Sequence, residues 1–312
     1  MFKKIFISAF VIVAAVFLFM CYGRKNLHIS KETIKATYSL PNSHFIKWNN
    51  GEIHYTESGK GFPILMIHGF GGSNYDFQQL DSLLNDQYRI IRIDLPGFGM
   101  SDFPNQLLKE KNYTEIYKDY FTFLIDTLHL DSMYVMGNSL GGMMAWNVTV
   151  NHPKNVKKII LFNSAGYDMK DVIKSANADV FTHSWVRMML RNGLPLFMTS
   201  KGVHRIFYNP SVVPKEKMIR MNALWNRDGN LNHLMSMASS DKYVDESLIK
   251  TITCPTLIIW GKQDVVVSPK YATYFHRDIK NSRVIVYDSC GHVPMVEKPL
   301  QVKKDVLEFL KE

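Results

Sequence analysis

The hydrophobic residues of this chain gather in short runs of strand length, separated by longer stretches of helical spacing. The clearest runs cover residues 62–67, 133–136, 158–162, 256–260 and 283–287. Short apolar runs bounded by turn residues are typical of strands buried inside a sheet. Residues 113–128, between two such regions, have helical spacing instead. This alternation predicts an α/β fold whose mostly parallel sheet carries helices on both faces.

The alternation stops between about residues 168 and 245. This stretch is rich in methionine and aromatic residues at helical spacing and contains no strand-like run. It predicts a helical cap inserted after the run at 158–162. Most of these side chains would pack inside the cap itself. A cap above the sheet would also form an apolar wall for a ligand, and flexible methionines suit irregular apolar ligands.

The N-terminus carries an apolar run over residues 5–22, with Ser8 as its only polar residue before the terminal tyrosine. Eighteen residues are just long enough to span a bilayer. No small-x-small cleavage site stands before Cys21, so we expect an uncleaved signal anchor, a transmembrane helix, over residues 1–25. Lipidation at Cys21 is the alternative, disfavoured because the large Met20 precedes the cysteine.

These boundaries divide the chain into an anchor, a polar tether over residues 26–44, a core and a cap. The core would comprise residues 45–167 and 246–312, with the cap at 168–245. Two lysines precede the apolar run, and four basic residues (Arg24, Lys25, Lys31 and Lys35) follow it. This bias taken alone would keep the folded domain in the cytoplasm, and it leaves the orientation open. Short Lys-Lys-apolar N-termini are commonly exported, so we expect the folded domain outside the cytoplasm, in the cell envelope.

The net charge of +9 falls to +5 once the four basic residues of the first 25 are set aside. The remaining lysines and arginines are scattered and form no basic stripe with aromatic residues, which argues against nucleic-acid binding. A mild attraction to an anionic membrane surface fits better. Cys254 precedes one strand-like run and Cys290 follows the next, so in parallel strands they lie at opposite ends of the sheet. We therefore expect free thiols.

The strongest chemical signal is Gly-Asn-Ser-Leu-Gly-Gly at residues 137–142, between an apolar run and a helical segment. A serine between glycines at a strand-to-helix turn is a nucleophile elbow, in which Ser139 is lifted clear of the sheet by a strained backbone. The following helix directs N–H groups toward an oxyanion formed there. A glycine-rich helix start with a capping serine is the plainer reading of the same residues.

Three further strand ends carry residues that complete such a site. Residues 68–72 read His-Gly-Phe-Gly-Gly, residues 261–264 read Gly-Lys-Gln-Asp, and residues 290–292 read Cys-Gly-His. The chain order is therefore glycine loop, Ser139, Asp264 and His292. This order is that of α/β-hydrolases and differs from the orders in chymotrypsin and subtilisin.

From about residue 45 to the C-terminus the chain resembles an α/β-hydrolase of the lipase and esterase type. These segments carry the resemblance, together with Asp-Leu-Pro-Gly-Phe-Gly-Met-Ser-Asp at 94–102 and Gly-His-Val-Pro at 291–294. The branch it resembles most is monoacylglycerol-lipase-like with a hydrophobic N-terminus. The resemblance implies an eight-stranded sheet, a small-molecule or lipid ester as substrate, and no metal or organic cofactor.

The triad chemistry assigns each residue a role. Ser139 attacks a carbonyl carbon, His292 takes and returns the proton, and Asp264 orients the imidazole. The resemblance implies an oxyanion hole made by the N–H groups of Phe70 and Leu140. Asp288 and Asp168 are alternative acids. Other polar residues carry no catalytic signal: we interpret His68 as structural and Asp94 and Asp102 as turn formers, and assign nothing to His54 and His129.

Two other functions stay open. The sequences of residues 96–99 and 137–139 also resemble those of hydrolases that cleave carbon–carbon bonds in aromatic ring-fission products. Residues 68–72, however, depart from the glycine loop of those enzymes. Such enzymes would need a carboxylate partner, for which the predicted cap offers Arg187, Arg191, Arg205, Arg220 and Arg227. A non-catalytic binding protein of the same fold is the other alternative. Epoxide hydrolases and haloalkane dehalogenases are excluded, because they place aspartate where Ser139 stands.

Overall fold

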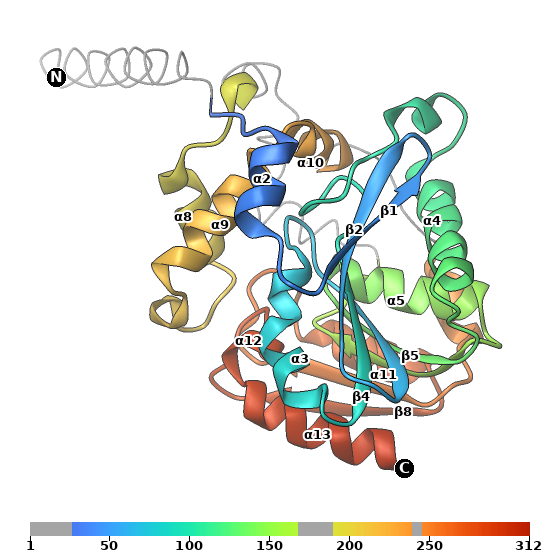
Figure 1. The fold of residues 1–312 in the computed structure, drawn as a ribbon. Helices are drawn as coiled ribbons and strands as arrows, with labels where there is room; N and C mark the ends of the chain where they lie inside the picture. The colour runs from blue at the N-terminus through green and yellow to red at the C-terminus, as the bar shows by residue number, and fades with distance from the viewer. Residues whose placement is uncertain (1–26, 168–189, 239–244) are drawn as a thin grey trace, which may run out of the picture.

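The computed structural model describes residues 27–167, 190–238 and 245–312 (Figure 1). The expected anchor at residues 1–25 lies outside these ranges. Among the helices within them, none combines the length and apolar character needed to cross a membrane.

A single eight-stranded sheet forms the centre of the molecule, in the order β1-β2-β4-β3-β5-β6-β7-β8. Strand β2 runs antiparallel to both of its neighbours, β1 and β4, and every pair from β4 to β8 in this order is parallel. The predicted fold class is therefore confirmed. The strands are β1 (Ser43–Trp48), β2 (Gly51–Ser58), β3 (Phe62–Ile67), β4 (Tyr88–Ile93), β5 (Met133–Asn138), β6 (Val156–Phe162), β7 (Thr256–Gly261) and β8 (Ser282–Tyr287).

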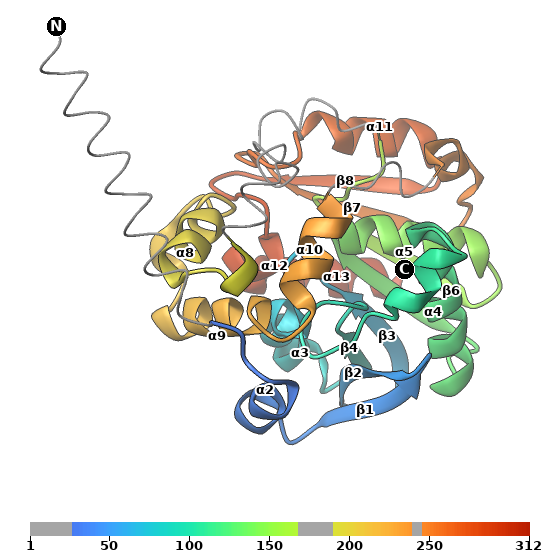
Figure 2. The same cartoon turned by 90° about the horizontal axis from the view of Figure 1, so that it is seen from above.

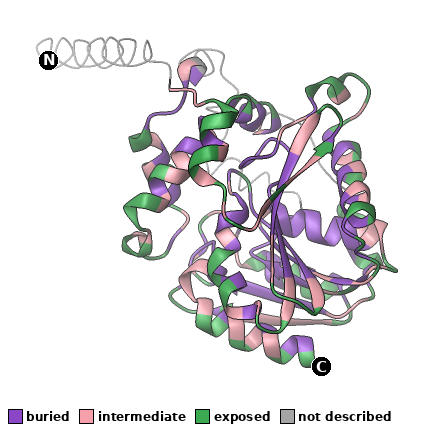
Figure 3. Ribbon diagram, in the orientation of Figure 1, coloured by how far each residue is buried: buried purple, intermediate pink, exposed green. Residues whose placement is uncertain are grey.

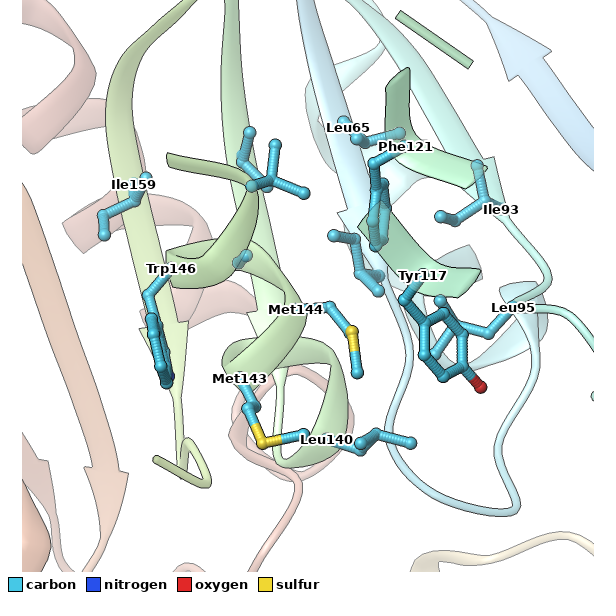
Figure 4. Packing of buried hydrophobic residues seen from close by; sticks show 14 of the residues in the cluster. Leu65, Ile93, Leu95, Tyr117, Phe121, Leu140, Met143, Met144, Trp146 and Ile159 are labelled. Atoms are coloured by element: carbon cyan, nitrogen blue, oxygen red, sulfur yellow. The ribbon is translucent and has the colours of Figure 1, made fainter. Parts of the chain in front are cut away.

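Helices cover both faces of this sheet, as the alternating runs predict. Along β3, Ile64 and Met66 pack in one cluster with α3 and α13, whereas Leu65 and Ile67 pack in another with α4 and α5 (Figure 4). One face carries α3 (Gln78–Leu84), α12 (Pro294–Glu297) and α13 (Pro299–Lys311), and the other carries α4 (Tyr113–Thr127), α5 (Leu140–Asn151) and α11 (Lys270–Asp278). Helix α5 is buried almost throughout (Figure 3), so the segment that follows Ser139 is held inside the core.

Three helices between β6 and β7 occupy the described part of the predicted cap. They are α8 (Leu196–His204), α9 (Lys215–Trp225) and α10 (Asn230–Ala238), and seen from above α10 lies over the middle of the molecule with α8 and α9 to one side (Figure 2). Short 3-10 turns complete the chain: η1 (Asn74–Phe77), η2 (Asn105–Lys109), η4 (Leu190–Asn192), η5 (Pro210–Val212) and η6 (Glu246–Thr251).

The segment expected to be a polar tether is folded against the rest of the molecule in its described part. Helix α2 (Lys31–Tyr38) begins at Ser30, whose hydroxyl accepts a hydrogen bond from the Thr33 N–H. Its fully buried Ile34 packs with residues of η1, of the loop after β4 and of α9. One apolar side chain on a short polar helix gives little periodic signal, so the sequence does not reveal this contact.

The cap is fastened to the core by Arg227, which follows α9 and is buried. Its guanidinium donates hydrogen bonds to the carbonyl oxygens of Met100 and Ser101 and lies 2.7 Å from Oδ1 of Asp102. Lys31 of α2 lies 2.8 Å from the same carboxylate oxygen. Burial raises the pKa of Asp102, but these cations outweigh it and the pKa is lowered. Asp102 therefore joins core, cap and α2 and does more than form a turn.

Candidate active site

Ser139 occupies the strained turn that the glycine pattern predicts. Its φ of 55° and ψ of −115° lie outside the regions that side-chain-bearing residues favour. A Cβ atom on Gly137 would overlap the Gly141 carbonyl oxygen, and one on Gly141 would overlap the Ile67 carbonyl oxygen. Side chains at these positions are therefore excluded, and the close approach of β3, β5 and α5 fixes the serine backbone.

His292 and Asp264 lie at the carboxyl ends of β8 and β7 and are both buried. Nδ1 of His292 is 2.8 Å from Oδ2 of Asp264. The other carboxylate oxygen accepts the N–H groups of Val266 and Val267 at 2.7 and 3.1 Å. Because Asp264 is surrounded by donors, it is positioned to act as an ionised acceptor that orients the imidazole.

Asn163 is a member of this cluster that the sequence analysis missed. It follows β6 with a positive φ of 44°, and its side-chain nitrogen donates to Oδ2 of Asp264 at 2.5 Å and to the Gly291 carbonyl oxygen at 3.3 Å. Asparagine tolerates the left-handed region better than most residues. Its signal was an asparagine directly after a buried strand, which is common in loops and points to no partner.

The backbone of His292 is held from two sides. Its N–H donates to the Ile206 carbonyl oxygen at 2.8 Å, and its carbonyl oxygen accepts the side-chain amide of Asn138 at 3.0 Å. Asn138 immediately precedes Ser139. The structure therefore brings the histidine loop to the serine turn, and the residue before the serine makes the connection.

Glu297 connects the same loop to the cap. Its carboxylate accepts the Gly291 N–H and the Tyr208 N–H, each at 2.8 Å. Burial raises the pKa of Glu297 although these backbone N–H groups favour the charged form. Glu297 is the second residue that sequence reasoning missed, since a glutamate on a short helix five residues after His292 carries no distinctive pattern.

The glycine loop at residues 68–72 lies beside the serine. A Cβ atom on Gly69 would be 3.3 Å from the Ser139 Cβ. Nδ1 of His68 is 2.7 Å from the Gly69 carbonyl oxygen, and its Nε2 is 3.0 Å from the Leu95 nitrogen, whose N–H it accepts. Both ring nitrogens of His68 thus meet backbone groups, which agrees with its interpretation as a structural histidine. The Gly71 carbonyl oxygen accepts the indole N–H of Trp225 from the cap at 2.5 Å.

Phe70 and Leu140, the expected oxyanion donors, flank this arrangement. Leu140 opens α5, and the first N–H groups of a helix lack partners within it. Phe70 belongs to the loop beside Ser139, with its ring half-exposed and in an edge contact with Phe98. Both N–H groups therefore belong to segments next to the serine.

Of the two alternative acids, Asp288 lies within the described residues and does not meet His292 there. Asp288 is exposed and pairs with Lys262 at 2.7 Å. Asp168 lies outside the described residues. Within those residues, no group of three or more His, Cys, Asp or Glu side chains is arranged to hold a metal ion.

A second serine–histidine–aspartate series lies on β1, β2 and the loop after β4, at residues that show no catalytic pattern in the sequence. His54 is fully buried. Its Nδ1 lies 2.7 Å from Oδ2 of Asp94, and its Nε2 lies 2.8 Å from the hydroxyl oxygen of Ser43. The interpretation of Asp94 as a turn former was incomplete, because its carboxylate also accepts the N–H groups of Asn74 and Met100. Burial raises the pKa of Asp94, but His54 and the other partners outweigh it, so the pKa is lowered.

This second series lacks the features of the Ser139 turn. Ser43 opens strand β1 and does not have a positive φ. Its hydroxyl oxygen accepts the Leu40 N–H at 2.9 Å. No helix begins after Ser43 to supply free N–H groups. We interpret the series as a link that ties the hairpin of β1 and β2 to the loop after β4.

Comparison with known proteins identifies relatives over most of the chain. The profile of the family described as alpha/beta hydrolase fold matches residues 63–199 and 207–299. Lipase 1 of Psychrobacter immobilis is 28% identical over 252 residues, which cover 78% of this chain and 75% of that protein. A 2-hydroxy-6-oxononadienedioate/2-hydroxy-6-oxononatrienedioate hydrolase of Pseudomonas putida is 27% identical over 286 residues, 86% of this chain and 96% of that protein. The crystal structure of a meta-cleavage product hydrolase variant shares the fold with a TM-score of 0.74 at 23% identity, covering 88% of this chain and 99% of that one.

Proposed function

Because this chain belongs to the α/β-hydrolase fold family, we propose that it is a serine hydrolase that cleaves carboxylic esters, with lipid-like acyl esters as its substrate class. One observation carries the proposal. His292 is hydrogen-bonded to buried Asp264 through Nδ1 and tied through its carbonyl oxygen to Asn138, the neighbour of the strained Ser139. We assign Nε2, the other ring nitrogen, to the serine hydroxyl.

In the proposed mechanism, Ser139 Oγ attacks the ester carbonyl while His292 Nε2 removes the hydroxyl proton. Asp264 holds the imidazole in the required tautomer and stabilises its cation. The N–H groups of Leu140 and Phe70 bind the oxyanion, and one such donor is typically worth about 3 kcal/mol of the barrier. His292 then protonates the leaving alcohol, and water hydrolyses the acyl-enzyme by the reverse proton path.

Apolar side chains around these residues support an acyl substrate. Phe70 and Val265 are large hydrophobic residues that stay 48% and 58% exposed, one in the glycine loop and the other directly after Asp264. Exposed apolar residues beside a reacting centre suit an acyl chain better than a charged group. The 28% identity to a lipase supports the same class.

Labelling by a fluorophosphonate, followed by hydrolysis of p-nitrophenyl esters and monoacylglycerols of increasing chain length, tests the proposal. We expect labelling at Ser139 only, turnover that peaks at medium or long chains, and loss of both in Ser139→Ala. Ser43→Ala is the matched control, because Ser43 also meets a histidine that meets an aspartate, and it should keep full labelling and turnover. A wild type that performs no better than Ser139→Ala would refute the proposal and favour a binding protein.

Carbon–carbon bond hydrolysis is the second candidate, favoured by the relative in Pseudomonas putida that this chain covers almost completely. That chemistry would call for a cation at the substrate carboxylate. Two cap arginines are already engaged: Arg227 with Asp102 and neighbouring carbonyl oxygens, and Arg220 with the ring of Tyr75 at 3.8 Å. Serine-dependent turnover of a vinylogous diketone acid, without ester hydrolysis, would replace the ester proposal by this one.

A further inference from the structure

The outer side of helices α8 and α9 exposes an unusual share of the large apolar side chains. Eleven large hydrophobic residues in the described part of the chain are exposed, and five of them fall within residues 196–219. Single exposed hydrophobic residues are ordinary, but a concentration in one region marks an interaction surface. The five, which we call the α8–α9 face, are Leu196, Phe197, Tyr208, Val212 and Ile219.

Positive charge is concentrated in the same segment. Residues 196–225 contain five lysine and arginine residues and one glutamate, a net charge of +4, whereas the whole of residues 26–312 carries only +5. Lys201 and Lys215 are exposed. The cation of Arg220 lies against the ring of Tyr75, and that of Lys217 lies 5.8 Å from the ring centroid of Phe207. Because Tyr75 and Phe207 are buried, these two cations pack inward, and Lys201 and Lys215 are the exposed lysines among the exposed apolar side chains.

The chain also enters the described structure beside this surface. The Leu27 N–H donates to the carbonyl oxygen of Asn192 at 2.7 Å, and Ile29 pairs in parallel with Arg227. The apolar run of the sequence ends at residue 22, and five residues reach at most about 18 Å. The apolar run is therefore joined to residue 27 by no more than this length of chain.

We propose that the α8–α9 face docks on an anionic lipid bilayer. The apolar side chains would enter the boundary between headgroups and acyl chains, and Lys201 and Lys215 would lie at the phosphates. A second copy of the chain would bring an identical +4 segment and repel the first. The chain's own apolar run would cover the hydrophobic residues but would bring no anion to Lys201 and Lys215. A bilayer of anionic lipid satisfies both features.

The proposal deepens the proposed function, because a lipid ester would then come from the same bilayer, but the docking itself can be tested separately. Benzoylphenylalanine in place of Phe197 is photoactivated in the full chain reconstituted in phosphatidylcholine vesicles with phosphatidylglycerol. We expect lipid adducts at this position. Leu108 of η2 is the matched control, since it is also an exposed large apolar residue but lies outside the α8–α9 face. It should give none. Adducts with a second copy or with residues 1–26, or no adduct at 197, would overturn the proposal.

Activity measurements give a second, independent test. Phe197→Glu should lower turnover of a vesicle-borne monoacylglycerol at least tenfold while leaving soluble p-nitrophenyl butyrate unchanged. Lys201→Gln and Lys215→Gln should each cost about fivefold on anionic vesicles, corresponding to ~1 kcal/mol per charge, and nothing on zwitterionic ones. Leu108→Glu should change neither substrate. Equal losses on both substrates, or none on vesicles, would overturn the docking. If the wild type hydrolyses neither ester, the proposed function fails, and the crosslinks still decide the docking.

Discussion

Replacing Asn163 by aspartate would put a second carboxylate where the structure has a hydrogen-bond donor to Asp264. The amide nitrogen is 2.5 Å from Oδ2 of Asp264, and Asn163 is fully buried. Aspartate has nearly the same shape and also tolerates the positive φ, so the change is electrostatic. Two ionised carboxylates at this separation would repel by about 7 kcal/mol at an effective dielectric constant of 20.

The folded variant avoids this repulsion by keeping one proton on the pair. Holding a carboxyl with an ordinary pKa near 3.9 protonated at pH 7 costs about 4 kcal/mol. The folded state then binds one proton more than the unfolded state, so the free energy of unfolding falls as pH rises, by about 1.4 kcal/mol per unit. The loss should begin above pH ~4 and continue until the pair ionises fully. Between pH 5 and 7 it should amount to about 3 kcal/mol.

Urea unfolding of Asn163→Asp and wild type at pH 5, 6 and 7, followed by tryptophan fluorescence, measures this loss. Asn50→Asp is the control, because Asn50 also has a positive φ, of 64°, but is exposed. Its difference from wild type should stay flat with pH. Parallel stability curves for Asn163→Asp and wild type would refute the assignment of Asp264 as a buried, ionised acceptor.

Three further changes probe the surroundings of the site. Arg227→Met should lower the free energy of unfolding by about 3–5 kcal/mol, because it leaves buried carbonyl groups and Asp102 without their main donor. The control Arg283→Met removes an exposed pairing with Glu308 and Glu312 and should lower it by less than about 1 kcal/mol. Equal losses of the two variants in urea unfolding would contradict the role of Arg227 in fastening the cap to the core. Burial raises the pKa of Glu297, so the wild type should lose stability as pH rises from about 4.3 through that raised pKa, and Glu297→Gln should abolish this slope. Burial also raises the pKa of Cys290 to about 12 and of Cys254 to about 11, so iodoacetamide at pH 8 should modify both in urea and neither in the native protein, as peptide masses would show.

Sequence reasoning located the parts of the site that short stretches of neighbouring residues identify. The elbow at Ser139 needs small residues at fixed positions, and the overlaps at Gly137 and Gly141 explain why. Asp264 and His292 each follow a strand-like run in the family's order. Hydrogen-bonding of the two at 2.8 Å agrees with these roles, which the enzymatic tests have still to examine.

The parts that it missed depend on contacts between distant segments. His54 meets Asp94 because β2 and β4 pair with Tyr55 opposite Ile93, a register that no local pattern encodes. Asn163 meets Asp264 across 101 positions of the chain, and Glu297 meets Tyr208 across 89 positions, each through one side chain. The docking of α2 likewise rests on one buried isoleucine and a few polar contacts. Such interactions become visible only when the strand order and the cap are in place.

The series Ser43–His54–Asp94 bears on how active sites are recognised in protein structures from the arrangement of side chains. A geometric template of hydroxyl, imidazole and carboxylate would match this molecule at that series, in a hairpin remote from the nucleophile turn. Side-chain spacing alone would therefore assign chemistry to what we interpret as a structural link. Templates become selective when they also require the left-handed serine backbone and the helix that starts behind it. In this protein the backbone conformation of Ser139, more than its distance from any partner, distinguishes the nucleophile turn from the Ser43–His54–Asp94 series.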